Sequence, residues 1–196
     1  IIMKKFFLIL LFLNLNFIHV FSVEPDVFVQ STVNRASEIL AKNISQEEKI
    51  SKLKVIAKET VDIQGVGFYS LGSARKNLSK EEKIQYLQLF EDYFLKSFSS
   101  RLSEYTNPQI DVLSKKVLSE NYTIVNSVLK GTSERPEVKI DWRIYTKNQD
   151  NPLIRDLIIE GLSLARTQKE EFASILNSND NNIESLFKIL KEFSSK

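Results

Sequence analysis

One stretch of the chain, residues 153–176, changes its hydrophobic period partway along and constrains the fold more than any other. From Leu157 to Leu164 it is apolar and β-branched, interrupted by few polar residues, which is typical of a strand that other elements cover on one face. From Arg166 onward its apolar residues follow the spacing of one helix face, and they are Phe172, Ile175 and Leu176. The sequence therefore predicts a strand that leads directly into a helix near residues 164–167.

Helical patterns fill the chain before this stretch and return after it. Two pairs, Ser45 with Glu48 and Ser79 with Glu82, have the capping-box spacing that begins a helix. The second pair begins the longest helix, whose wide apolar and aromatic face an ordinary core helix would also have. The expected helices span residues 25–42, 46–61, 62–76, 79–105, 167–177 and 183–193.

Three glycines, Gly65, Gly67 and Gly72, lie in the third expected helix. Their spacing is not that of a phosphate-binding loop, and no strand leads into them. We expect them to allow another segment of backbone to pack closely against this helix.

Strand patterns replace helical ones after Asn107-Pro108. The expected strands span residues 109–118, 122–130, 138–145 and 153–164, joined by short polar turns. Four such strands in succession predict an antiparallel meander. Because helices and strands are segregated along the chain, the expected fold class is α+β, with N-terminal helices packed on one face of a four-stranded antiparallel meander sheet and two C-terminal helices.

The first residues have the pattern of a secretory signal peptide. Lys4 and Lys5 follow Met3, and residues 6–21 form an apolar run that ends before the small residue Ser22. A retained membrane anchor is the alternative, but a run of about 16 residues is shorter than the roughly 20 that span a bilayer. We therefore expect a signal peptide over residues 1–22 and a single domain over residues 23–196.

Removal of the signal would leave a chain without net charge, cysteine or histidine. Two of the 27 basic residues lie in the signal, so the remaining 25 balance the 25 acidic residues, which argues against a nucleic-acid-binding surface. The only histidine, His19, also lies there, so no Cys–His nucleophile, imidazole base or ordinary zinc site is available. We expect no enzymatic activity, no metal and no cofactor.

The order of motifs carries a resemblance to a known family. The residues that carry it are Val61-Asp62, Leu71-Gly72, Arg75, Ser79, Phe90, Phe94, Tyr105, the run Asp156 to Leu164, and Glu171-Phe172. The most specific of them is Asp156-(x)3-Glu160-Gly161-(x)-Ser163. On these residues the chain resembles the MlaC family, also called the toluene-tolerance family, over residues 25–194. It departs from the usual pattern at Pro152 and Arg155, where the family commonly has aromatic residues.

The resemblance implies a periplasmic phospholipid carrier of the system that maintains outer-membrane lipid asymmetry. Such a carrier would hold one phospholipid, with its acyl chains between helices and a curved sheet. It would dock transiently to an inner-membrane ABC transporter complex and to an outer-membrane lipoprotein complex. Two ordinary acyl chains hold about 28 methylenes, and at about 0.8 kcal/mol each their exposure to water costs on the order of 20 kcal/mol. A dry apolar cavity would remove most of that barrier.

The expected lining of this cavity consists of apolar and aromatic residues from the helices and the strands, although plain core packing would account for the same residues. They are Phe68, Leu71, Phe90, Phe94, Phe98, Trp142, Ile144, Ile158 and Leu162. Three arginines, Arg75, Arg143 and Arg166, are candidates for contact with the lipid phosphate.

Three acidic residues in the matched motifs, Asp62, Asp156 and Glu160, could suggest hydrolytic chemistry. Four residues apart in one strand, Asp156 and Glu160 would lie roughly 13 Å apart. This exceeds the roughly 10 Å that a two-carboxylate mechanism allows. We expect ion pairs with Arg75 or Arg166 instead, or a helix cap from Asp62.

Two other functions remain open from the sequence. One is a non-catalytic periplasmic binding or scaffold module of the same fold with a filled core and no lipid. The other is a small hydrolase, which the missing His, Cys and Gly-x-Ser-x-Gly motif disfavour.

Overall fold

The computed structural model describes residues 22–133 and 135–195 of the 196-residue chain. The expected signal peptide and its alternative, a retained anchor, concern residues 1–22, which lie outside the described part except for Ser22. In the part that is described, no helix is both long and apolar enough to cross a membrane.

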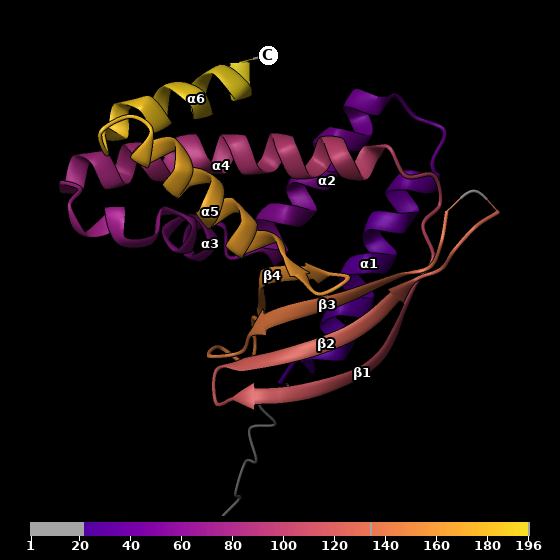
Figure 1. The fold of residues 1–196 in the computed structure, drawn as a ribbon. Coiled ribbons are helices and arrows are strands. Elements are labelled where there is room, and N and C mark those ends of the chain that lie inside the picture. Colours follow the sequence, from indigo (N-terminus) through magenta and orange to yellow (C-terminus); the bar gives the residue numbers. More distant parts are fainter. Residues whose placement is uncertain (1–21, 134, 196) are drawn as a thin grey trace, which may run out of the picture.

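Helices and strands are segregated along the described chain, as predicted (Figure 1). The helices are α1 (Pro25–Ala41), α2 (Gln46–Thr60), α3 (Ile63–Leu71), the 3-10 helix η1 (Gly72–Lys76), α4 (Lys80–Ser103), α5 (Leu164–Asn177) and α6 (Ile183–Ser195). The strands are β1 (Ile110–Ser119), β2 (Tyr122–Leu129), β3 (Val138–Tyr145), β4 (Leu153–Ile159) and β5 (Leu162–Ser163). They form one antiparallel meander in the order β1-β2-β3-β4-β5, so the α+β class is confirmed.

The expected fourth strand is in fact two strands, and the prediction of a four-stranded sheet was wrong in this respect. The chain reverses at Glu160 and Gly161, whose φ angles are 49° and 84°, and Leu162–Ser163 pairs back onto β4. Two successive residues with positive φ make the tight hairpin turn that suits a twisted sheet. Hydrophobic periodicity does not detect this reversal, because the strand on each side of a two-residue turn keeps the same period.

Helices cover one side of the sheet in two groups (Figure 1). Close backbone approaches join α1 to β1 and β2, while α3 and α5 approach β4. The long helix α4 makes its close approaches to α2, α3 and α6. Side chains from α4 and from the strands nevertheless belong to one continuous hydrophobic core. The layer between α4 and the sheet is therefore spanned by side chains rather than by close backbone packing.

The predicted alternation of β3 is confirmed. Ile140, Trp142 and Ile144 are buried in the core, and the residues between them face the other side of the sheet. The indole Nε1 of Trp142 donates a 2.8 Å hydrogen bond to Ser127 Oγ, which donates in turn to the Ile140 carbonyl. Because its polar group is satisfied, the hydrogen bond offsets the cost of removing the indole N–H from water.

Side-chain caps start the helices where the sequence predicted them, with one difference. Ser79 and Glu82 form the complete capping box of α4. At α2 only half of the box forms, because Glu48 N donates to Ser45 Oγ while the Glu48 carboxylate lies 3.5 Å from Lys52 Nζ. A salt bridge four residues along the helix competes with the box for that carboxylate.

Candidate functional site

Six of the nine predicted lining residues meet in the interior between the helices and the sheet. Leu71, Phe90, Trp142 and Ile144 are buried in the core, and Phe94 and Phe98 are half-buried and packed against it.

The other three predicted lining residues lie elsewhere. Phe68 is half-buried on α3 but is not part of the core cluster. Ile158 pairs with Asp141 across β3 and β4, which places it on the face of the sheet away from Trp142. Leu162, in the short strand β5, is 59% exposed. The structure therefore corrects the placement of Ile158 and Leu162, because the turn at Glu160 and an irregular register in β4 change which side chains point inward.

Both walls of the interior become more exposed toward the same end. On β3 the inward side chains change from Ile144, fully buried, to Val138, half-buried beside the β2–β3 turn. On α4 they change from Tyr86, fully buried, to Phe98, half-buried, although Leu95 on the same helix stays buried. Half-buried Phe94 and Leu129 belong to the same region. We call this region the exposed end of the interior.

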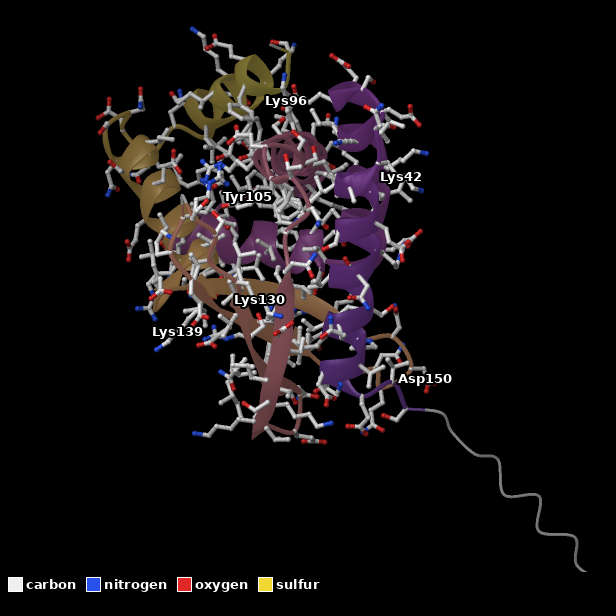
Figure 2. The ribbon with its side chains drawn as sticks, turned by 90° about the vertical axis from the view of Figure 1, so that its right-hand side faces the viewer. Lys42, Lys96, Tyr105, Lys130, Lys139 and Asp150 are labelled. Carbon is white, nitrogen blue, oxygen red and sulfur yellow. The ribbon has the colours of Figure 1, made fainter. Side chains whose placement is uncertain are left out.

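Figure 2 looks onto the exposed end, with Tyr105, just after α4, above Lys130, just after β2. Here the Cζ atom of Arg135, in the β2–β3 turn, lies 5.1 Å from the centroid of the Tyr105 ring. This cation–π contact joins the two walls. The sequence contained no signal for it, because the two residues lie far apart along the chain in irregular segments.

The opposite end of the interior is filled by aromatic rings. The ring of Phe90 lies 5.7–6.3 Å from those of Tyr86, Tyr93, Phe94 and Phe172. Tyr86 Oη donates a 2.8 Å hydrogen bond to the Gly67 carbonyl, and burial raises the pKa of Tyr86 well above its usual value, so the phenol stays neutral.

Two of the glycines in α3 allow side chains, rather than another backbone, to approach closely, which corrects the prediction. A Cβ atom at Gly67 would lie 2.8 Å from Phe90 Cδ1. One at Gly65 would collide with the carboxylate of Asp62. Gly72 instead ends α3 with a φ of 60°, a backbone conformation that favours glycine.

Two surface hollows lie mostly outside the predicted cavity. One, of about 430 Å³, is bounded by η1, α5 and the α5–α6 turn, and Leu71 is the only predicted lining residue that reaches it. The other, of about 320 Å³, lies between α1 and residues 107–110 and contains none of them. Neither of these two hollows is the predicted acyl-chain region.

The three predicted head-group arginines lie on three different elements. Arg75, in η1, is exposed, and its Nη1 lies 3.4 Å from the Phe68 carbonyl oxygen. Arg143 lies on the outer face of β3, with Nη1 3.9 Å from Asp156 Oδ2, and its buried Nε has no hydrogen-bond partner among the described residues. Arg166 is exposed in the first turn of α5.

An arginine that the sequence analysis noted only as a departure from the family pattern is at the centre of a charged cluster. Arg155 Nη2 lies 2.6 Å from Asp62 Oδ2, its Nη1 donates to Tyr122 Oη, and its Cζ lies 3.6 Å from the centroid of the Tyr145 ring. Burial lowers the pKa of Arg155, but the bonds to Asp62 and Tyr122 outweigh it and the net shift is upward. The predicted helix cap is confirmed, because Asp62 also accepts from Gly65 N at the start of α3.

This cluster provides a test of how much the ion pair contributes to stability. Asp62→Asn keeps an oxygen to cap Gly65 but removes the charge facing Arg155, so we expect the free energy of unfolding to fall by about 1.5 kcal/mol, since the pair is partly exposed. Urea denaturation would measure the loss. In an Arg155→Met background, Asp62→Asn should hardly lower the free energy of unfolding. An equal loss in both backgrounds would mean that the ion pair does not cause the destabilisation.

The family-like motif of β4 and α5 is a structural clamp. Asp156, only 6% exposed, accepts a hydrogen bond from Ser163 Oγ at 2.6 Å and one from Ala165 N at 3.0 Å. Ser163 Oγ also accepts from Arg166 N and so caps α5. These bonds fix the start of α5 against β4 across the Glu160-Gly161 turn.

The ion pairs expected between the acidic residues and Arg75 or Arg166 are not the ones that form. Asp62 pairs with Arg155, and Asp156 lies near Arg143. Glu160 lies in the turn, and its carboxylate accepts from Lys139 N. Among residues 22–133 and 135–195, no three His, Cys, Asp or Glu side chains gather as a metal site.

Comparison with known proteins places this geometry in context. The sequence model of the family described as "MlaC protein" matches residues 30–192. The intermembrane phospholipid transport system binding protein MlaC of Haemophilus influenzae is 24% identical over 187 residues, which cover 89% of this chain and 87% of that protein. A phospholipid-binding protein from Ralstonia solanacearum, solved in complex with a phospholipid, has the same fold with a TM-score of 0.74 at 15% identity, over 88% of this chain and 98% of that one.

Proposed function

The chain belongs to the MlaC family, and from this membership we propose that it is a non-catalytic, periplasmic phospholipid-binding carrier. It is exported by the signal peptide at residues 1–22 and shuttles lipid between an inner-membrane ABC transporter complex and an outer-membrane lipoprotein complex. The names of the relatives, one from an intermembrane phospholipid transport system and one solved with a phospholipid, support this proposal.

One observation of this structure carries the proposal furthest: both walls of the interior become more exposed toward the same end. Phe94, Phe98 and Val138 are half-buried at this end, so each leaves part of its apolar surface in water, which is unfavourable. An acyl chain that enters there would complete the burial of these side chains as well as its own.

The acyl chains enter between α4 and the sheet. Because this layer is spanned by side chains, rotation of Phe94 and Phe98 makes space without separating closely packed backbones. Trp142, Ile144 and Leu71 remain in place as the floor of the cavity. Phe90 cannot move as freely, because aromatic rings and the Cα of Gly67 enclose it.

The second candidate function is a binding or scaffold module with a filled core and no lipid. The observation that favours it is the dense packing of aromatic rings around Phe90. Lipid content separates the two functions.

We expect residues 23–196, purified from a bacterial periplasm, to carry phospholipid at about one molecule per chain, because the proposed acyl-chain region lies within one hydrophobic core. Native mass spectrometry would detect the complex, and organic extraction would identify the lipid. A protein that stays at its apo mass, both as purified and after incubation with phospholipid vesicles, would support the filled-core module and exclude the carrier.

A further inference from the structure

The exposed end has a cation whose side chain contacts an aromatic ring. Arg135 lies over Tyr105, and in the part of the chain that the structure describes it forms no ion pair. Its neighbour Lys130 is engaged, with Nζ 2.8 Å from Asp111 Oδ2.

The backbone holds Arg135 at this position. Arg135 N donates to Thr132 Oγ1 at 3.2 Å, and Thr132 N donates to the Arg135 carbonyl at 2.8 Å. At Gly131 a Cβ atom would lie 2.9 Å from Glu137 N, so the two arms of the turn are close together there. The backbone of Arg135 is thus fixed, while rotation about the side-chain bonds lets the guanidinium contact different groups nearby.

The position of this guanidinium matches that of a lipid head group. Acyl chains that lie between α4 and the sheet would leave the interior between Phe98 and Val138, where Arg135 and Tyr105 join the two walls. The head group of such a lipid, with its phosphate, comes to rest beside the contact.

We propose that Arg135 binds the phosphate of the carried lipid, exchanging the Tyr105 ring for the phosphate oxygens, and so selects phosphate-bearing lipids over neutral lipids with the same chains. This inference rests on the proposed carrier function. None of the three arginines selected from the sequence has this placement, because Arg143 faces away from the interior and Arg75 and Arg166 lie on η1 and α5.

The exchange is favourable on general grounds. A guanidinium over an exposed aromatic ring is weakly held, whereas two parallel N–H···O bonds to a phosphate join opposite charges in a matching geometry. The Tyr105 ring therefore acts as a temporary partner that keeps the cation at the entrance while no lipid is bound.

The test compares two ligands that differ in the phosphate. Calorimetric titration of the delipidated protein with dioctanoyl phosphatidylglycerol and with dioctanoylglycerol isolates the contribution of the head group. Arg135→Gln should weaken binding of the phospholipid by about tenfold and leave that of the diacylglycerol unchanged. The matched control is Lys139→Gln, which removes one positive charge from an exposed side chain at the start of β3 and should change neither affinity by as much as twofold.

A second variant tests the exchange itself. Tyr105→Leu removes the competing ring, so the ratio of phospholipid affinity to diacylglycerol affinity should rise by about threefold. A fall in this ratio would mean that Tyr105 holds Arg135 in its binding position, and it would overturn the exchange.

The remaining outcomes separate the inference from the function on which it rests. Equal loss of both ligands in Arg135→Gln would overturn the role of Arg135 while leaving the carrier intact. If wild-type protein binds neither ligand, the carrier function falls as well. Inorganic phosphate alone should compete weakly, and competition as strong as that of the phospholipid would overturn the assignment to a lipid phosphate.

Discussion

Replacing Asp156 with alanine should lower the free energy of unfolding by about 3 kcal/mol, because it removes both bonds of the clamp. The Ala165 N–H would then stay buried without an acceptor, and Arg143 would lose its nearest carboxylate. For a domain of this size such a loss shifts the melting temperature by roughly 6–12 °C. Thermal unfolding followed by circular dichroism would measure it.

The control for this substitution is Glu170→Ala, on the exposed side of the same helix α5. We expect the free energy of unfolding of this variant to stay within about 0.5 kcal/mol of the wild-type value. Ser163→Ala removes the cap and one of the two bonds to Asp156. Its loss of unfolding free energy should lie between those of Glu170→Ala and Asp156→Ala. A loss below about 1 kcal/mol for Asp156→Ala would contradict the view that the motif is a structural clamp.

Phe98→Asp should reduce phospholipid affinity at least about 100-fold, the largest effect on function that we expect from a single residue. It places a carboxylate on the acyl-chain wall, where bound lipid would remove it from water. Because Phe98 is half-buried at the exposed end, the unliganded protein can leave the new charge in solvent and stay folded. Lipid co-purification and titration of the delipidated protein would both report the loss.

Ile84→Asp is the matched control, since Ile84 lies on the same helix, is 52% exposed and is remote from the exposed end of the interior. We expect it to leave lipid binding unchanged. Phe98→Leu, which keeps the wall apolar, should retain most of the affinity. If folded Phe98→Asp protein carried lipid as wild type does, the acyl chains would have to lie elsewhere, and the proposed entrance between α4 and the sheet would be wrong.

Local signals in the sequence were sufficient to predict most of the elements. The Ser79–Glu82 capping box placed the start of α4, and the alternation of Val138 to Tyr145 identified β3 and its inward face. Such features depend on residues close in the chain, which is why they can be predicted without tertiary contacts. The turn at Glu160 escaped prediction because its strands are short and keep one period through it.

The interior could be predicted only in part. Aromatic residues at helical spacing indicated that Phe94 and Phe98 face the core, but not that both stay half-buried there. That property depends on where α4 ends relative to the β2–β3 turn, which is a distance between elements. For the same reason the sequence pointed to Arg75 and Arg166 and not to Arg135 or Arg155.

By itself, the sequence determined the α+β class, the order of helices and strands and the family to which the chain belongs, because each of these is encoded in residues a few positions apart. Only the tertiary structure decided which side chains lie together. It brought Arg155 to Asp62 and Arg135 to Tyr105 across long separations in the chain, and it placed Ile158 on the face of the sheet away from the core. Side-chain partners depend on how the sheet curves beneath the helices, and no local pattern of residues encodes that curvature.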